Sequence, residues 1–581
     1  MKKIFFPAMA AMALGLASCS SDDVTPNGGG GVDFSNGGYV KLSIYLPSAS
    51  QSRAVTNSEN DQFDDGMASE YSVKNAQLIL FSGTDEATAT FHSAYDLSTS
   101  FNMDGNTDQI TSTTRVVKQT TDNGGNGNGK VLYALVVLNN NGETIVETGN
   151  KLTVGGQDFT GTFTDFKNQL STTTTGTCKF ASNVATNGIF MTNAPLASAP
   201  GGSTEPTDAN ITTLTDVTNS VYNTEAEAQS KPAATVYVER GVAKVTMQSY
   251  KGNKTLSGPE FQGKDVSFEV VGWALDVTNK SSYLVRHVNS AWNTLHSDLV
   301  TTTGINTYRF IGSSVVENGL YRTYWAEDPN YSTNPADAFT IQPANFNEYS
   351  DKFDDENPQY CYENTFDVDN QRQDRTTRAL VKVQLTLKNG TKGEDLYTLN
   401  QNRSELYSLD NLKDRIATAV AHAQGKQSVT IADNSNITFE AEDADKSTYK
   451  VKDITTTDGT VSSEEVAYVN NEIGLITKYD NGYAYYPVRI KHFGDSATPW
   501  KSDNTGVSAN DVYNGKNDNQ YLGRYGVVRN NWYDLSVTGI SGVGTPRTPD
   551  TSKDYDDELS SYISVRINIL SWAKRHQDAE L

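Results

Sequence analysis

The feature that most constrains the fold is a recurring alternation of apolar and polar residues with a period of two. Successive side chains of a strand point to opposite faces of a sheet, so this period predicts half-buried β-strands. Strands are expected at residues 39–46, 76–81, 131–138, 234–247, 266–277, 379–387, 483–490, 532–537 and 562–572. The chain is therefore predicted to be mainly β, with a few short helices.

The clearest helix is predicted at residues 409–424, where a period near 3.6 replaces the period of two. Ser408 stands at the N-cap position, and Gly425 follows the last turn, as is typical of helix ends. One face is apolar and carries Leu409, Leu412, Ile416 and Val420. A second, shorter helix is expected at residues 165–170.

Two domains are expected, because a loose polar stretch at residues 198–232 separates two sets of predicted strands. The boundary is predicted near Pro232. It divides the body of the chain into an N-terminal domain at residues 54–232 and a C-terminal domain at residues 233–581.

The first 18 residues predict a lipoprotein signal peptide. Lys2 and Lys3 precede an apolar run at residues 4–17, which is shorter than the ~20 residues that a membrane-spanning helix needs. Small residues precede Cys19, where a signal peptidase would cut. Cys19 is then the expected lipidation site, and stable anchoring takes more than one acyl chain. Residues 19–53 would form a lipidated propeptide.

The propeptide contains a strand that a protease could remove. A glycine-rich tether is followed by alternating apolar residues, which are Val40, Leu42, Ile44 and Leu46. After Pro47 the residues are small and polar, with one arginine, as is typical of segments that proteases cut. Cleavage between Arg53 and Ala54 is therefore a candidate event; a solvated loop arginine is the alternative.

The last predicted strand, at residues 562–572, shows the strongest alternation. Its apolar positions are Ile563, Val565, Ile567 and Ile569, and Trp572 closes it. Residues 545–561 upstream are rich in Pro, Asp and Ser and could carry the strand away from its own domain. If the N-terminal strand leaves a groove, a strand of another subunit can fill it. An ordinary edge strand is the alternative.

Composition and spacing exclude several classes of function. The formal net charge of -23 and the pI near 4.7 argue against nucleic acid as a partner. The six histidines lack the close pairing of a zinc site or a catalytic couple, and there is no Gly-x-Ser-x-Gly motif. We expect no enzymatic activity, no cofactor and no metal. Cys178 and Cys361 either pair or stay as buried thiols.

Several segments resemble the fimbrillins of Bacteroidales, which build type V pili, and most of all the shaft subunit of the short, or minor, fimbria. The likeness lies in the lipobox at Cys19, in the strand before Arg53 and in four further segments. These segments are residues 238–245, 485–490, 525–535 and 567–572. Residues 84–130 and 196–231 match no motif of the family.

The resemblance implies two tandem β-sandwich-like (transthyretin-like) domains and an outer-membrane lipoprotein precursor. An extracellular arginine-specific protease would cut at Arg53, and strand exchange would join identical subunits head to tail. Residues 39–46 would be removed, and residues 562–572 would be the donor strand.

Accessory tip and anchor subunits, contact with host or bacterial surfaces, and biofilm formation are further expectations from the family. Two other interpretations stay open. The 30 Tyr and 6 Trp also suit a surface glycan-binding lipoprotein, and a fimbrial tip or anchor subunit is the second possibility. Cleavage at Lys41 by a lysine-directed enzyme is an alternative to cleavage at Arg53.

Overall fold

The structure is a computed structural model. It describes residues 38–46, 66–98, 101–103, 109–116, 131–173, 178–198, 211–222, 224–261, 264–288, 311–317, 320–323, 325–333, 335, 337–367, 370–444, 447–492, 523, 525–554, 563–571 and 573–575. The predictions for the signal peptide, Cys19, Arg53, Ala54 and Trp572 lie outside these residues.

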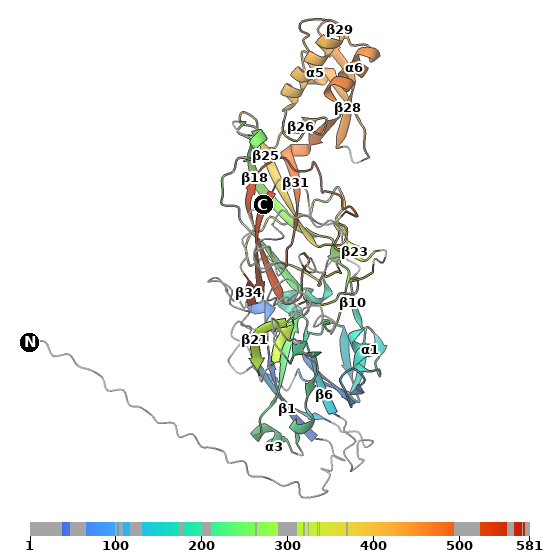
Figure 1. The fold of residues 1–581 in the computed structure, drawn as a ribbon, viewed down its shortest axis with the longest axis vertical. Helices are drawn as coiled ribbons and strands as arrows, with labels where there is room; N and C mark the ends of the chain where they lie inside the picture. Colours follow the sequence, from blue (N-terminus) through green and yellow to red (C-terminus); the bar gives the residue numbers. More distant parts are fainter. Residues whose placement is uncertain are drawn as a thin grey trace, which may run out of the picture.

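The predicted mainly β fold is confirmed, and the molecule is elongated (Figure 1). One end is built on a large sheet with the strand order β3-β2-β6-β11-β16-β1-β5-β4. Two short strands also belong to this sheet: β14 pairs with β6, and β15 pairs with β1. Its strands are β1 (Gly38–Tyr45), β2 (Ala76–Gly83), β3 (Thr90–Asp96), β4 (Phe101–Met103), β5 (Gln109–Val116), β6 (Val131–Leu138), β11 (Met191–Asn193), β14 (Thr215–Asp216), β15 (Val221–Tyr222) and β16 (Ala234–Arg240).

Both faces of this first sheet are covered. In β2 and β6, alternate residues such as Leu78 and Ile79 join two different hydrophobic cores. This explains why these strands are nearly continuous apolar runs. Smaller elements cover the faces: β7 (Thr144–Glu147), β8 (Lys151–Val154), β9 (Gln157–Asp158), β10 (Leu170–Thr172), β12 (Leu196–Ala197), β13 (Ile211–Thr212), α1 (Phe163–Lys167), α2 (Val184–Asn187) and α3 (Glu225–Ser230).

The middle of the molecule is a β-sandwich. One sheet has the order β24-β17-β32-β33-β34 and the other β18-β25-β31, and their inner faces share one core. The strands are β17 (Ala243–Gln248), β18 (Ser267–Asp276), β24 (Gln359–Cys361), β25 (Arg378–Thr386), β31 (Tyr483–Arg489), β32 (Asn531–Ile540), β33 (Ile563–Ser571) and β34 (Ala573–Arg575). Three smaller sheets complete the body: β19 (Thr278–Asn279) pairs with β23 (Phe339–Thr340), β20 (Ser281–Tyr283) pairs with β10, and β21 (Ile311–Glu317) and β22 (Leu320–Thr323) form a sheet with β12 and β13.

The chain passes from the first sheet to the sandwich at Gly241 and Val242. The single strand predicted at residues 234–247 is therefore wrong, because β16 and β17 belong to different sheets. Gly241 permits the crossing, since a Cβ there would lie 2.8 Å from the Phe180 ring. The division into domains at Pro232 stays a prediction.

Residues 396–479, which we call the module, form the end of the molecule opposite β1 (Figure 1). The module has a separate core beneath α5 (Leu409–Ala423) and α6 (Ser463–Ile473). Its strands are β26 (Leu396–Leu399), β27 (Ile437–Ala441), β28 (Thr448–Thr456), β29 (Gly459–Thr460) and β30 (Ile476–Tyr479).

The helix predictions had mixed outcomes. The one at residues 409–424 is confirmed as α5, and the Ser408 side chain accepts a hydrogen bond from the Asn411 amide. The helix predicted at residues 165–170 exists, but it begins two residues earlier, at Phe163, because Thr162 is its N-cap. α6 was not predicted, although Ser462 and Glu465 form a capping box at its start. No helix in the described part of the chain is long and apolar enough to cross a membrane.

The remaining short elements are 3₁₀ turns. They are η1 (Ala68–Glu70), η3 (Lys179–Ala181), η4 (Thr218–Ser220), η5 (Pro259–Phe261), η7 (Asn434–Asn436) and η8 (Asp480–Gly482). Of these, η1 matters for the site below, because it directly follows the part of the chain that contains Arg53.

Candidate assembly site

Strand β1 lies inside the first sheet and not at its edge. It pairs in parallel with β16, where Leu42 lies opposite Ala234, and antiparallel with β5, where Leu42 lies opposite Ser112. Among the described strands, β5 and β4 join the rest of the sheet through β1. Removing β1 would therefore leave backbone groups unpaired on both sides of an empty slot.

The alternation in β1 corresponds to its burial. Val40, Leu42 and Ile44 are completely buried, and Leu46 is 2% exposed. All four belong to one core with residues from β2, β6 and β16. Burial of four large aliphatic side chains contributes roughly 6–12 kcal/mol, so an empty slot strongly favours a replacement strand.

The polar side of β1 also has partners. The Lys41 ammonium donates a hydrogen bond to the Gln229 carbonyl in α3 at 3.1 Å. The Tyr45 ring stacks on Tyr237 of β16, with 5.3 Å between the ring centroids. Lys41 is thus held within a paired strand, which makes it a poor protease site.

The turn η1 is fixed to the sandwich through Glu70, which is completely buried. Its carboxylate lies 2.8 Å from the Lys244 ammonium and accepts a hydrogen bond from the Tyr360 hydroxyl at 2.5 Å. Lys244 also lies over the Trp532 ring, 3.7 Å from its centroid. Burial, together with the Glu70 charge, raises the pKa of Tyr360 far above its usual value. The chain that follows the predicted cleavage site is therefore anchored independently of β1.

Strand β33, the predicted donor, pairs along its length with β32 of its own chain. The pairing is antiparallel, from Ile563 opposite Ile540 to Ser571 opposite Asn531, with one irregularity between Val537 and Gly539. It then turns into β34, which pairs back on it. The strand predicted to be the donor therefore lies within the sandwich of its own chain.

Residues 541–554, which we call the strap, lead from β32 towards β33 and are held firmly. Thr545 and Tyr485 exchange two backbone hydrogen bonds of 2.9 Å. The Arg378 guanidinium donates to the Pro549 carbonyl at 2.6 Å, and the Gln373 amide donates to the Asp554 carbonyl at 3.0 Å. The prediction of a loose linker over residues 545–561 is therefore wrong for its first part.

The segments that carry the family resemblance contain buried charges. In residues 238–245, Glu239 pairs with Arg286 at 2.9 Å. In residues 525–535, Arg529 lies 3.4 Å from Glu363, and both side chains are 1% exposed. These pairs lie where the first sheet meets the sandwich. From the sequence alone these residues would be taken as exposed charges, because the neighbouring sequence does not indicate that a charged side chain is buried.

Cys178 and Cys361 are free, buried thiols. Burial raises the pKa of Cys361 to about 12, which keeps the thiol protonated and unreactive. Within the described ranges, no group of three or more His, Cys, Asp and Glu side chains is placed to hold a metal ion.

Residues 477–578 match the family model "Major fimbrial subunit protein type IV, Fimbrillin, C-terminal". This range includes β31, β32, the strap, β33 and β34. The predicted resemblance to fimbrillins is confirmed by this match, and the chain carries a fimbrillin C-terminal region. No curated protein matches the chain.

Solved structures of low similarity include fimbrial proteins. A fimbrilin (fimA) from Porphyromonas gingivalis W83 is 12% identical, with 93% of this chain and 99% of that chain covered and a TM-score of 0.36. The tip fimbrial protein Mfa3 from Porphyromonas gingivalis is 9% identical, with 91% and 99% covered and a TM-score of 0.26. A fimbrial assembly protein from Parabacteroides distasonis ATCC 8503 is 11% identical, with 60% and 98% covered and a TM-score of 0.23.

Proposed function

We propose that the chain is a structural subunit of a fimbrial shaft, exported as a lipoprotein through Cys19 and cleaved between Arg53 and Ala54. Cleavage would free β1, and the C-terminal strand of another copy would take its place. The observation that carries this proposal is the position of β1. It is an internal strand whose apolar side chains are buried, and the predicted cut would separate it from the rest of its domain.

The two strands are matched in length and pattern. β1 covers residues 38–45 and β33 covers residues 563–571. Ile563, Val565, Ile567 and Ile569 alternate as Val40, Leu42, Ile44 and Leu46 do. An incoming strand can therefore reproduce the backbone pairing with β5 and β16 and refill the same apolar positions. The free energy of assembly comes from this replacement, without a nucleotide or metal.

The strap defines how far the donor can reach. Because residues up to Asp554 are hydrogen-bonded to the sandwich, β33 would pivot from Asp554. Residues 555–562, when fully extended, span at most roughly 26–29 Å. The neighbouring slot must therefore lie close to this point, which favours end-to-end contact of subunits.

The partners of this mechanism are identical subunits, accessory tip and anchor subunits, and an extracellular arginine-specific protease. Adhesion to host or bacterial surfaces and biofilm formation would follow from the fibre. A tip subunit would lack a usable donor strand, and an anchor subunit would keep β1. The alternation in residues 563–569 favours a shaft position over both.

The cleavage step is tested by treating Arg53→Ala and Lys41→Ala variants with an arginine-specific protease. We expect the first to remain monomeric and the second to form fibres that begin at Ala54 by N-terminal sequencing. Fibres from Arg53→Ala with an unchanged start would disprove the cleavage site.

The donor assignment is tested by a chain that ends at Ser561. It should fold and be cleaved but stay monomeric in electron micrographs. Fibres of normal length from this truncation would disprove the assignment of residues 562–572 as donor.

A further inference from the structure

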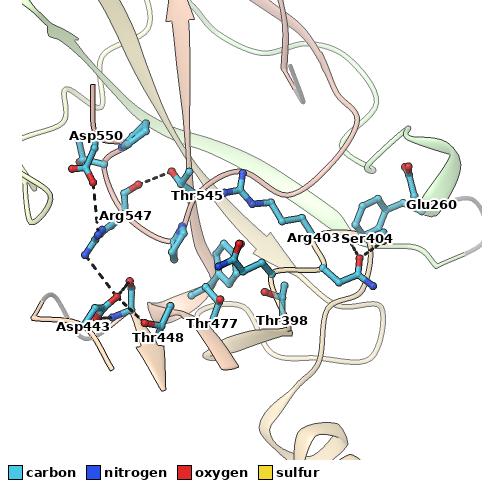
Figure 2. A pocket seen from close by; sticks show the side chains of 18 residues that line it. Glu260, Thr398, Arg403, Ser404, Asp443, Thr448, Thr477, Thr545, Arg547 and Asp550 are labelled. Carbon is cyan, nitrogen blue, oxygen red and sulfur yellow. Dashed lines mark hydrogen bonds and ion pairs between the residues drawn. The ribbon is translucent and has the colours of Figure 1, made fainter. Parts of the chain in front are cut away.

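A cleft of about 820 Å³ separates the module from the strap (Figure 2). Residues 545–550 of the strap form one wall. The other wall comes from the module, at Thr398, residues 401–404, Asp443, Ser447, Thr448, Thr477 and Tyr479, and Glu260 and Phe261 of η5 complete the lining. Its volume falls within the range of pockets that hold small organic ligands, roughly 300–1,000 Å³.

The lining is mixed: Phe261, Tyr479, Pro546 and Pro549 supply apolar surface, and polar side chains supply hydrogen-bond donors and acceptors. Hydroxyl and amide groups come from Thr398, Gln401, Asn402, Ser404, Ser447, Thr448, Thr477, Thr545 and Thr548. Side chains of this kind suit a ligand whose own groups both donate and accept hydrogen bonds, as sugar hydroxyls do. Ser404, Ser447, Thr448, Thr545 and Thr548 already have hydrogen-bond partners within the protein, so a ligand would meet their remaining lone pairs and the Gln401 and Asn402 amides.

The two arginines of the cleft differ in their contacts. Arg547 lies 4.0 Å from the Asp443 carboxylate and 3.8 Å from the Asp550 carboxylate. Arg403 is half-buried and forms no ion pair or hydrogen bond with any described residue. Figure 2 shows its side chain extending from the module towards the strap. A half-buried guanidinium without a partner, in a chain of net charge -23, is available to an anionic group.

A second unpartnered group lies in the same wall. The Thr398 hydroxyl is buried and has no hydrogen-bond partner within the described part of the chain. Leaving a buried hydroxyl unpaired costs about 1–3 kcal/mol. Thr398 is 0% exposed, so a ligand reaches its hydroxyl only if the wall shifts, whereas the half-buried Arg403 is accessible directly.

The carboxylates at the cleft limit how negative that ligand can be. Glu260, Asp443 and Asp550 line it, and Asp443 also accepts hydrogen bonds from Ser447 and Thr448. These three acids would repel a dense polyanion such as a nucleotide triphosphate. A single carboxylate on each sugar unit fits better, because Arg403 can bind it in a bidentate manner while the hydroxyls face the polar walls.

We propose that this cleft binds an oligosaccharide that carries carboxylates, with the carboxylate on Arg403 and the sugar hydroxyls on the threonine, serine and amide side chains. This site would give the fimbrial subunit a recognition function. It is independent of the strand slot, since β1 and the module lie at opposite ends of the molecule (Figure 1).

The test uses the full chain and isothermal titration with oligogalacturonates of two to four units. Their methyl esters are the neutral controls, since esterification removes the charge but keeps the ring hydroxyls. We expect saturable binding with one site per chain for the acids and at least tenfold weaker binding for the esters. No saturable binding of any of the acids would overturn the proposal.

Two substitutions locate the site. Arg403→Gln should weaken binding of the acid at least tenfold and remove the difference between acid and ester, and Arg403→Lys should have an intermediate effect. Both should fold, because Arg403 forms no hydrogen bond or ion pair with a described residue. Arg415→Gln is the matched control, because Arg415 lies on α5 of the same module, paired with Glu472 and outside the cleft. Equal affinities for wild type and Arg403→Gln would overturn the assignment.

Discussion

Lys244 shows how a single buried charge fixes the turn η1 to the sandwich. Its side chain is completely buried between the Glu70 carboxylate and the Trp532 ring. Replacing it with Ala leaves the Glu70 charge buried with one compensating partner fewer. We expect Lys244→Ala to lower the free energy of unfolding by roughly 3–5 kcal/mol, measured by denaturant titration.

The matched control for this substitution is Lys450→Ala. Lys450 pairs with Glu442 at 2.7 Å, but its side chain is 48% exposed. Exposed pairs contribute roughly 0–1 kcal/mol, so the control should unfold nearly as the wild type does. Equal effects of the two substitutions would contradict the role assigned to Lys244.

His287 should make stability depend on pH. Its ring stacks on Tyr283, and its Nε2 lies 2.7 Å from the Lys167 carbonyl oxygen. Burial lowers the pKa of His287 from 6.5 to about 4. Between these values the unfolded chain binds more protons than the folded chain, so stability falls as pH falls from 6.5 to 4.

The measurement is the unfolding free energy of wild type minus that of His287→Gln. This difference should shrink by roughly 2 kcal/mol from pH 7 to pH 4, after allowance for partial exposure. Asp328, whose pKa burial raises to about 7, acts in the opposite direction in both proteins. A difference that does not change with pH would show that His287 titrates normally.

Among individual residues, the buried charged side chains could not be predicted from the sequence. Lys, Glu and Arg are almost always exposed, so composition assigns Glu70, Lys244 and Arg529 to the surface. Their partners lie far away in sequence; Glu70 and Lys244 are 174 positions apart. The apolar positions of β1, in contrast, follow directly from alternation, because one face of a strand must meet a core.

At the scale of elements, a disulfide that fixes the strap and a disulfide that fixes the predicted donor strand β33 should have different effects on assembly. Thr545 and Tyr485 are directly opposed, as are Ser536 and Arg566. Opposed strand residues have Cα atoms about 5.5 Å apart or less, which a disulfide can bridge. We expect a Thr545→Cys/Tyr485→Cys lock to leave assembly intact, because the strap stays in place. A Ser536→Cys/Arg566→Cys lock should block assembly, because it holds β33 on β32.

Both variants are compared after cleavage, oxidised and with a reductant, by following fibre growth with light scattering. Reductant should restore assembly of the Ser536→Cys/Arg566→Cys protein. If the oxidised form of this variant assembles as fast as wild type, β33 is not the strand that moves. If the strap lock alone blocks assembly, the pivot lies upstream of Asp554.

Element prediction was most reliable where a strand has one covered face. β31 was predicted almost to its ends. The split of residues 234–247 into β16 and β17 was missed, although the apolar alternation changes phase there, from Val236 and Val238 to Val245 and Met247. The internal position of β1 could not be predicted either. It depends on pairing with residues 109–116 and 234–237, and local sequence does not encode register between distant strands.

At the scale of the whole molecule, recognition and assembly are assigned to opposite ends. The slot of β1 lies at one end and the module at the other (Figure 1). The module has a separate core; among its described residues, Leu396 and Tyr479 at its two ends belong to the core of the sandwich, and Leu406 packs against that core. Such an insertion should be removable without loss of the fold that carries it.

The removal can be made where the module enters and leaves the sandwich. Tyr397 and Lys478 are paired neighbours in β26 and β30, so an Asn-Gly turn can replace residues 398–477 and close a hairpin. We expect the shortened protein to unfold cooperatively and, after cleavage, to form fibres while losing oligogalacturonate binding. The matched control replaces residues 145–157 with the same turn. It removes fewer residues but takes Leu152 and Val154 from the core of the first sheet, and should destabilise the protein more. If the shortened protein cannot assemble, the module takes part in subunit contact, and the two ends of the molecule do not act independently.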